Sequence, residues 1–257
     1  MLVWLLENTM LKKLTEKNNI KLDHNIGPLV EKLAVQLQFV PVYPELFEEA
    51  LTHSSYANEH KVPDNERLEF LGDSVLSLIT ASFLFKTYPN YNEGDLAKLK
   101  SIIVSTRVLA SFAKQLQLDS YIRLGTGELR NNGQTKPSIL EDLFEAFIGA
   151  YFLNFGLEQT TQLIGPLIKE NLAEANRQFT LINAKNDLQE FSQSQGLFPE
   201  YRTLKEEGPP HQRRFTVGVF LENRQVGMGE GNSLKEAQNK AALEAIAKLT
   251  DKNRFPT

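Results

Sequence analysis

Residues 64–79, which read DNERLEFLGDSVLSLI, combine an apolar side with a row of acids. On a helix, where successive residues turn by about 100°, Glu66, Glu69 and Asp73 fall within about 60° of one another. The opposite arc is apolar and consists of Leu68, Leu71, Val75, Leu78 and Ile79. Like charges at helical spacing repel each other, so the acidic face needs a positive partner, and a divalent cation is the natural candidate.

A second stretch, residues 138–153 (SILEDLFEAFIGAYFL), has the same division into an acidic and an apolar side. Asp142 and Glu145 are three residues apart and therefore share a helical face. Ala146 and Gly149 flank them, and side chains this small allow another helix to come close. The residues that point the other way are Leu140, Phe144, Phe147 and Tyr151.

Both helices have candidate capping residues at their starts. Asp64 or Asn65 is placed to cap the first helix, because their side-chain oxygens accept hydrogen bonds from free backbone N–H groups. Ser138 followed by Glu141 has the spacing of a capping box at the start of the second helix. This pattern gives Glu141 a local structural role and leaves Asp142 free for chemistry.

If the two acidic faces meet, four carboxylates converge, namely Glu69, Asp73, Asp142 and Glu145. Oxygen ligands favour Mg²⁺ or Mn²⁺ over zinc or copper. Mg²⁺ keeps much of its water and takes few carboxylates together with phosphate oxygens, so an open acidic pocket suits phosphodiester hydrolysis by a metal-bound water. The alternative is that each acidic face is simply a solvated helix surface.

A carboxylate-bridged di-iron site is a second use for the same acids, but it requires Glu-x-x-His pairs. The residues three positions after Glu69 and Glu145 are Gly72 and Ile148, which cannot bind iron. The sequence therefore argues against di-iron chemistry.

Three blocks together resemble bacterial ribonuclease III: ALTHSSYANE (50–59), NERLEFLGD (65–73) and ILEDLFEAFIGAYFL (139–153). The likeness extends from about residue 28 to residue 250. It implies a homodimeric, Mg²⁺-dependent endonuclease, with Mn²⁺ as a substitute, that cuts double-stranded RNA. The implied products have 5′-phosphate and 3′-hydroxyl ends with two-nucleotide 3′ overhangs. The family also suggests ribosomal RNA precursors and structured messages as substrates. It implies no membrane partner and no organic cofactor.

The resemblance also implies roles for individual residues. The metal ligands that it implies are Glu69, Asp73, Asp142 and Glu145. Asp73 and Glu145 match the residues usually named as catalytic, and Glu66 and Glu93 match acids with supporting roles. His53, Ser54 and Ser55 lie in a matching block, but we assign them no chemistry and expect a satisfied polar turn packed on the acidic helix.

Phe70 matches an aromatic residue that enters the partner subunit in this family. The helical arrangement supports this independently, because Phe70 lies about 40° from Glu66, away from the apolar arc. A large aromatic side chain there is exposed in a monomer and suits an interface anchor.

Two alternatives use the same helices: a non-cleaving RNA-binding regulator, which would lack one acid, and a helical scaffold that binds no metal.

The length of 257 residues and a hydrophobic content of 41% are sufficient for two domains with real cores. The absence of cysteine excludes disulfides and thiolate zinc sites, and it suits a reducing, cytoplasmic compartment. Residues 1–26 are expected to form a short N-terminal extension, since their apolar run is too short for a signal peptide or a membrane span. The net charge of −4 means that attraction to phosphates must come from local basic patches.

The chain divides into an all-α catalytic domain over residues 27–175 and a small α-β-β-β-α domain over residues 184–251. Helices are predicted near 28–38, 44–51, 64–87, 93–115, 138–153 and 157–175, with a loop at 125–137 and a domain break near 176–184. The second domain is predicted to contain a helix at 184–195, strands at 200–205, 213–221 and 224–230, and a helix at 233–249. Asn223-Arg224 is the predicted hairpin turn, and Ser233 the predicted cap of the last helix.

This element order, with GEGNSLKEAQNKAA at 229–242, resembles a double-stranded-RNA-binding domain, which reads the shape of A-form RNA. The implied RNA-binding residues are Gln189, Glu190, Gln193, His211, Lys235 and Lys240. Leu234 and Gln238 replace two usually basic positions at the start of the last helix. Fewer lysines release fewer counterions, so we expect weaker and less salt-dependent binding by this domain.

Overall fold

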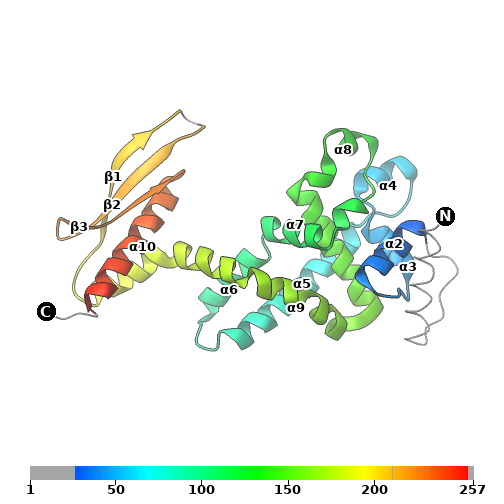
Figure 1. The fold of residues 1–257 in the computed structure, drawn as a ribbon, viewed down its shortest axis with the longest axis horizontal. Coiled ribbons are helices and arrows are strands. Elements are labelled where there is room, and N and C mark those ends of the chain that lie inside the picture. Colours follow the sequence, from blue (N-terminus) through cyan, green and yellow to red (C-terminus); the bar gives the residue numbers. More distant parts are fainter. Residues whose placement is uncertain (1–26, 210, 254–257) are drawn as a thin grey trace. The chain divides into compact units, whose positions relative to one another are not determined.

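The computed structural model describes residues 27–209 and 211–253 and divides the chain into two compact units (Figure 1). The first unit extends to Leu172, and the second begins at Ala173. The extension predicted for residues 1–26 lies outside the described residues.

The described part of the first unit is helical, as predicted. Its helices before the last are α2 (Pro28–Leu37), α3 (Pro44–Ala50), α4 (Ser54–His60), α5 (Glu66–Thr87), α6 (Glu93–Ile103), α7 (Thr106–Gln115) and α8 (Thr126–Arg130). Two short 3-10 turns cover Leu118–Ser120 and Gly133–Thr135. The last helix, α9, begins at Pro137 and ends at Gln193.

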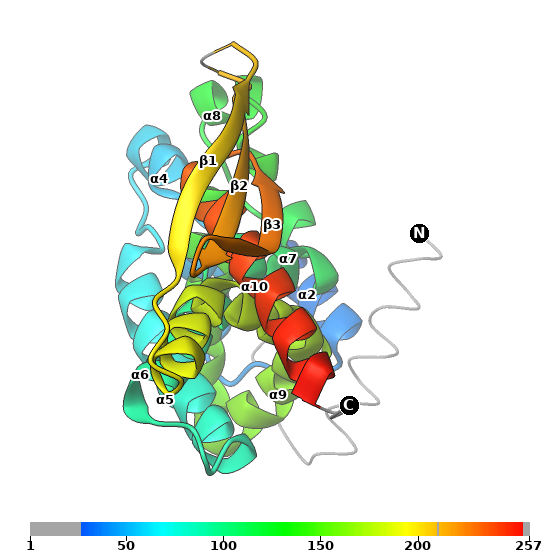
Figure 2. The same cartoon turned by 90° about the vertical axis from the view of Figure 1, so that its left-hand side faces the viewer.

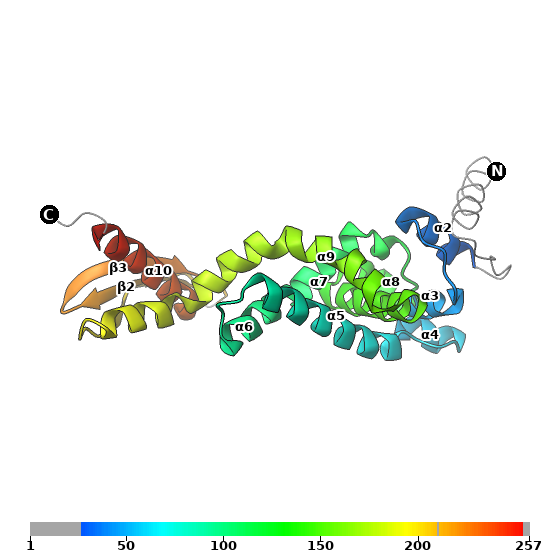
Figure 3. The same cartoon turned by 90° about the horizontal axis from the view of Figure 1, so that it is seen from below.

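The beginning of α9 forms the centre of the first unit. Its side chains are fully buried on several sides of the helix, and those with no exposed surface include Leu140, Leu143, Phe144, Phe147, Ile148 and Ala150. The Phe147 ring lies 5.8 Å from that of Phe47 in α3, and the Phe144 ring lies 5.6 Å from that of Phe112 in α7. A helix buried on this many sides holds the other helices around it (Figure 3), and α5 packs directly against it.

Among the described residues, α5 is the one helix long and apolar enough to cross a membrane by length and composition. Core helices of soluble proteins meet the same criterion. In α5, Leu68, Val75, Leu76 and Ile79 are buried within the unit, and Glu66, Glu69 and Asp73 occupy its first turns. Packing and charge therefore identify it as a core helix.

The predicted helix over 93–115 is two helices in the structure. Helix α6 ends at Ile103, and Ser105 has an extended backbone (ψ 150°) before α7 begins at Thr106. The apolar periodicity continues through both helices, which explains why it did not indicate the break.

The three helices predicted between residues 138 and 195 form one helical run, interrupted only at Gly156. Gly156 has φ 75° and ψ 177°, a backbone conformation that a side chain disfavours, and the chain bends there. Residues 176–184, where we predicted the domain break, are helical in α9. Good helix-forming residues such as Arg, Gln and Leu occur in this segment, and it has no Gly or Pro to end the helix.

The polar segment 125–137 is also ordered, although we predicted a flexible loop. It forms α8 and the 3-10 turn Gly133–Thr135. The Glu59 carboxylate of α4 accepts hydrogen bonds from the backbone N–H and the hydroxyl of Thr126, and Lys136 pairs with Glu128 at 2.6 Å. These contacts between distant positions were not visible in local sequence.

The second unit contains a three-stranded antiparallel sheet in the order β1-β2-β3, formed by Glu200–Glu207, Arg214–Leu221 and Arg224–Gly231. Helix α10 (Leu234–Asn253) covers one face (Figure 2). The core combines the end of α9, the sheet and α10, through Ala184, Leu188, Val219, Ala241, Ala242 and Ala245. This arrangement confirms the predicted α-β-β-β-α fold.

The hairpin between β2 and β3 turns at Glu222 and Asn223, one residue earlier than predicted. Both have positive φ, 46° and 65°, which is the backbone twist that two-residue hairpins favour. The prediction of Ser233 as the cap of α10 is confirmed, since its hydroxyl accepts from the Glu236 N–H at 3.2 Å. The Glu236 carboxylate in turn accepts from the Asn232 N–H at 2.9 Å.

Candidate active site

Helices α5 and α9 cross in backbone contact at two glycines. A Cβ atom added to Gly72 would lie 3.0 Å from the Gly149 nitrogen and would collide with the carbonyl oxygen of Glu145. A Cβ atom on Gly149 would lie 3.3 Å from the Gly72 nitrogen and collide with the carbonyl oxygen of Leu68. The prediction that small residues at this face admit a second helix is therefore confirmed.

This crossing brings the predicted acids together, because each of them lies within about two turns of it along its own helix. Glu69 and Asp73 lie on either side of Gly72 in α5. Glu145, whose carbonyl group borders Gly72, lies one turn after Asp142 in α9. Glu69, Asp142 and Glu145 are partly buried, and Asp73 is exposed.

The electrostatics of the site reflect this crowding. Burial, followed by the charges of Asp73, Glu141, Glu69 and Asp142 in that order of effect, raises the pKa of Glu145 to about 8. Burial, followed by the charges of Asp142 and Glu66, raises the pKa of Glu69 to about 7. Carboxylates from both helices therefore act on one another.

Asp142 differs from these two acids because one of its neighbours has a charge that lowers its pKa. Burial raises its pKa, but the charge of His53 has the next largest effect and lowers it. The structure thus adds His53, to which we assigned no chemistry, to the surroundings of the site.

Glu141 is a further acid that sequence reasoning assigned to a cap. Helix α9 begins one residue before Ser138, with Pro137 in its first turn, and the Glu141 carboxylate hydrogen-bonds Thr106 instead. Burial raises the pKa of Glu141, and its charge acts on both Glu69 and Glu145. The signal was present in the sequence, because Glu141 lies four residues before Glu145 and thus on the same helical face.

Helix α5 begins where the sequence predicts, and one of the two candidate residues caps it. Asn65 occupies the N-cap position but makes no capping hydrogen bond through its side chain. The neighbouring Asp64 carboxylate performs that role, because it accepts from the Glu66 N–H at 3.3 Å.

These carboxylates fit a divalent cation in the chemistry of their donors, since all of them offer oxygen and repel one another. Within the described residues, no group of three or more Asp, Glu or His side chains is arranged as it stands to hold a metal ion. A hydrated Mg²⁺ needs only one or two direct carboxylate ligands, with water filling the remaining positions. The site therefore suits an open, hydrated cation and not a closed cage.

The two supporting acids lie in different surroundings. Glu66 is exposed in the first turn of α5, and its charge raises the pKa of both Glu69 and Asp142. Glu93 is exposed in the first turn of α6, where it lines a groove with Leu78, Phe85 and other residues. The structure thus groups Glu66 with the acids at the crossing and places Glu93 in this other groove.

Phe70 is exposed, as predicted, with 78% of its surface accessible. It borders a hollow of about 610 Å³, which is also lined by Leu46, Arg67, Leu71 and Leu153. Leu78, by contrast, belongs to the apolar arc opposite the acids but is 55% exposed. It lies on the same side of α5 as Phe70, eight residues further on.

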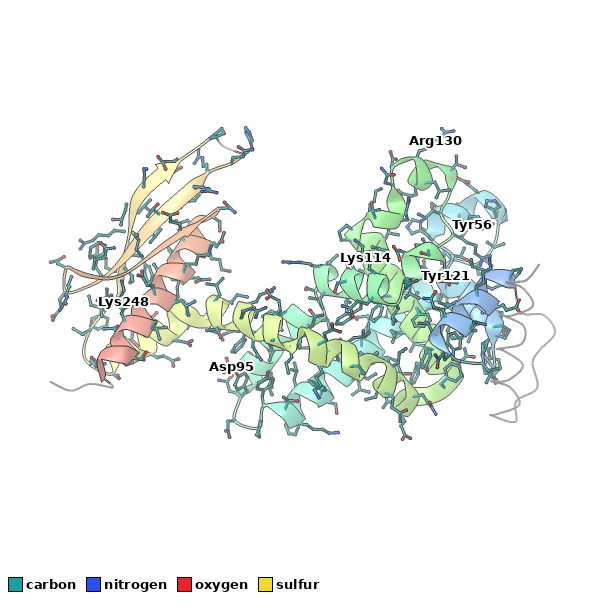
Figure 4. All side chains as sticks on the ribbon, in the orientation of Figure 1. Tyr56, Asp95, Lys114, Tyr121, Arg130 and Lys248 are labelled. Atoms are coloured by element: carbon teal, nitrogen blue, oxygen red, sulfur yellow. The ribbon has the colours of Figure 1, made fainter. Side chains whose placement is uncertain are left out.

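Two basic residues precede the acids of α9. Arg130 is exposed at the end of α8 (Figure 4), where it is accessible to a phosphate group. Lys136 is less accessible to other partners, because it is paired with Glu128.

The predicted RNA-binding residues are at the surface of the second unit. Gln189, Glu190 and Gln193 are exposed near the end of α9, while His211 and Lys235 are exposed beside β2 and at the start of α10. Pro210, predicted beside His211, lies outside the described residues. Lys240 is also exposed, but it pairs with Glu236 at 2.7 Å.

Gln238 stands at one of the usually basic positions and takes part in a contact within the unit. Its side-chain oxygen accepts a hydrogen bond from Lys185 of α9 at 2.7 Å. The Lys185 ammonium group also lies 4.8 Å from the centre of the Tyr201 ring. Lys185 therefore ties the end of α9 to α10 and to the sheet.

Comparison with known proteins gives matches over both parts of the chain. Residues 43–172 match the family model described as Ribonuclease-III-like, and residues 184–249 match the double-stranded RNA binding motif. A Ribonuclease 3 from Latilactobacillus sakei is 42% identical over 79% of this chain and 90% of its own. One from Bacillus cereus is 44% identical over 80% of this chain and 86% of its own.

The helical unit also resembles a solved structure. The nuclease domain of ribonuclease III from Campylobacter jejuni matches with a TM-score of 0.52 and 40% sequence identity, over 56% of this chain and 99% of that domain. That domain is described as structurally flexible in a region involved in dimer formation. The chain therefore belongs to the ribonuclease III family, and it is an endoribonuclease whose helical nuclease domain is followed by a double-stranded-RNA-binding domain.

Proposed function

We propose that this protein is a Mg²⁺-dependent endonuclease that hydrolyses both strands of an RNA duplex. The observation that carries the proposal is the crossing of α5 and α9 at Gly72 and Gly149, around which acids of both helices interact. We assign the nuclease domain to residues 27–175 and the RNA-binding domain to residues 184–251.

Glu69, Asp73, Asp142 and Glu145 are the residues that hold the cation in this proposal. When bound, Mg²⁺, or Mn²⁺ in its place, supplies the positive charge that activates a water and stabilises the leaving oxygen. The protein orients the carboxylates through the close helix crossing, and we assign Asp73 and Glu145 to catalysis. Glu66, whose charge acts on Glu69 and Asp142, supports them. For Glu93, which lies in the other groove, the supporting role in this proposal comes from the family resemblance alone.

Hydrolysis with water attack at the phosphorus and departure of the 3′ oxygen leaves 5′-phosphate and 3′-hydroxyl ends. We propose that two copies of the site in a homodimer each cut one strand, and that the products carry the two-nucleotide 3′ overhangs that the family resemblance implies. We further propose that the protein acts in the cytoplasm on ribosomal RNA precursors and structured messages, as the family resemblance implies. No organic cofactor enters this proposal.

The exposed side of α5 supports the homodimer. Phe70, Leu78 and Phe85 lie along it and are 78%, 55% and 72% exposed. Apolar side chains at such spacing, beside the hollow that Phe70 borders, are typical of an interface. The nuclease domain of the Campylobacter protein has a region involved in dimer formation, which supports the same arrangement for this chain.

Cleavage of a long RNA duplex with Mg²⁺ tests this function. We expect short duplexes whose 5′ ends are substrates for a phosphatase, and no cleavage of single-stranded RNA of the same composition. Replacing Mg²⁺ with Ca²⁺ separates binding of the duplex from its cleavage. An intact duplex after incubation with Mg²⁺ or Mn²⁺ would refute the proposal.

A further inference from the structure

Most basic side chains of the second unit are already engaged within it. Five of them form ion pairs, namely Arg202, Lys205, Arg213, Lys240 and Lys248. A sixth, Lys185, donates a hydrogen bond to Gln238. Over residues 184–209 and 211–250, the basic side chains without an ion pair or a side-chain hydrogen bond are therefore Arg214, Arg224 and Lys235. These three are free to bind a phosphate without giving up a partner.

Arg214 differs from the other two because it borders a hollow that no acidic side chain lines. The hollow has a volume of about 530 Å³. Its lining residues are His211, Gln212, Arg213, Arg214 and Asn232. Arg214 is exposed there at the start of β2, whereas its neighbour Arg213 pairs with Glu206 at 2.7 Å. An anion in this hollow therefore meets hydrogen-bond donors and a free guanidinium group.

This hollow joins two segments that are far apart in the sequence. His211 lies in the connection between β1 and β2, and Asn232 lies between β3 and α10. Arg214 also borders a second hollow of about 240 Å³, but Glu230 and Glu236 line that one. A phosphate therefore fits the first hollow, between the two connections.

We propose that Arg214 binds a backbone phosphate of duplex RNA in the first hollow. A guanidinium group donates two parallel hydrogen bonds to phosphate oxygens, which fixes the phosphate in position. Its charge offsets part of what Leu234 and Gln238 remove from the start of α10. The inference rests on the proposed binding of duplex RNA, and it adds a residue outside the set that the family resemblance implies.

The salt dependence of RNA binding by the full-length protein measures this contact. A labelled duplex of about 20 base pairs exceeds the roughly 16 that such a domain spans, and Ca²⁺ in place of Mg²⁺ keeps it intact. We expect Arg214→Ala to lower the slope of log K against log salt by about 1, as read by fluorescence anisotropy. The loss should be equal for duplexes of different sequence, because a phosphate contact carries no sequence information. Arg214→Lys keeps the charge and should retain the wild-type slope.

Arg224→Ala is the matched control. Arg224 is also exposed, and among the described residues it has no ion-pair partner. It pairs with Leu221 at the far end of β2, about 23 Å along the strand from Arg214. Both substitutions remove one positive charge from the same domain, but Arg224→Ala should leave the slope unchanged.

Equal slopes for Arg214→Ala and Arg224→Ala would overturn the inference, because position in the domain would then not matter. A slope for Arg214→Lys as low as that for Arg214→Ala would also overturn it, because the charge would then not be the cause. If the wild type binds the duplex and either result is found, the inference about Arg214 fails and the proposed function stands. If the wild type binds no duplex at low salt, both fail.

Discussion

Gly72 of α5 and Gly149 of α9 face each other in backbone contact, and neither position has space for a methyl group. The contact is closer than side-chain packing allows, so it sets how near the acids of the two helices can come. Small residues permit this approach in the same way wherever two helices touch through their backbones.

Gly72→Ala should force the two helices apart. We expect a loss of about 1–3 kcal/mol in the free energy of unfolding, the usual cost of overfilling a packed core, together with reduced cleavage. Gly127→Ala is the control, because a Cβ atom there has no neighbour within 4 Å. Its effect should stay within about 0.5 kcal/mol in the same chemical denaturation experiment. Equal stability of the two variants would contradict the close crossing.

Glu145→Gln keeps the shape of the side chain but removes its charge. Glu145 is proposed to bind the cation that stabilises the leaving oxygen. Without this ligand we expect the transition state to lose about 3 kcal/mol of stabilisation, which lowers the cleavage rate by about 100-fold or more. Binding of duplex RNA in Ca²⁺ should be retained, as measured by gel shift. Full activity of the variant would exclude this role.

Thermal stability without divalent cations should fall as the pH rises from 6 to 9. The folded state raises the pKa of Glu69 to about 7 and that of Glu145 to about 8, against an ordinary value of 4.5. A raised pKa means that the folded state binds more protons, so this stability is fully present below pH 4.5 and is lost through pH 7 and 8.

Glu145→Gln should therefore raise the melting temperature at pH 9 and flatten its pH dependence. We expect a gain of about 1 kcal/mol, since solvent screens part of the repulsion. Mg²⁺ should flatten the profile of the wild type as well, by offsetting the same repulsion. A wild-type melting temperature that increases between pH 6 and 9 in EDTA would contradict the raised pKa values.

Phe70→Ala should weaken the dimer and lower the activity together. Loss of an interface anchor typically costs about 2 kcal/mol or more, which corresponds to about 30-fold in the dimer dissociation constant. Phe198→Ala is a matched control, because Phe198 is 73% exposed but lies in the second unit. Sedimentation equilibrium distinguishes the two, and a fully active monomeric Phe70→Ala variant would refute the two-subunit arrangement.

Lys235→Ala should reduce the salt dependence of RNA binding. If Lys235 contacts a phosphate, its loss lowers the slope of log K against log salt by about 1. Lys248 lies further along α10 (Figure 4) and pairs with Glu244 at 2.7 Å, so Lys248→Ala should leave the slope unchanged. Equal slopes for the two variants would remove Lys235 from the RNA-binding surface.

Much of the nuclease domain was predictable, because helical periodicity separates the acids of 64–79 and 138–153 from their apolar neighbours. The same geometry identified the small residues at the crossing and the exposure of Phe70. The strands of the second domain were predicted from the alternation of apolar and polar residues, and its last helix from the capping residue Ser233. These features depend on residues close together in the sequence.

The features that sequence reasoning missed depend on contacts between distant segments. The Glu141 carboxylate forms a hydrogen bond with Thr106 and does not cap the helix at Ser138. The His53 ring is hydrogen-bonded to Ser55, whose hydroxyl accepts from the Gly125 N–H. The helix runs on through residues 176–184 because that segment has no local stop signal, so a change of domain there did not require a break in the helix. Gly156 is a bend because its backbone has positive φ, which a glycine permits but does not predict.

Anomalous diffraction from crystals containing Mn²⁺ tests the central claim most directly. The proposed function predicts an anomalous peak between the acids of α5 and α9, within about 2–2.5 Å of oxygens from at least one carboxylate among Glu69, Asp73, Asp142 and Glu145. A protein that cleaves duplex RNA but binds Mn²⁺ away from these two helices, or shows no peak there at saturating metal, would contradict it.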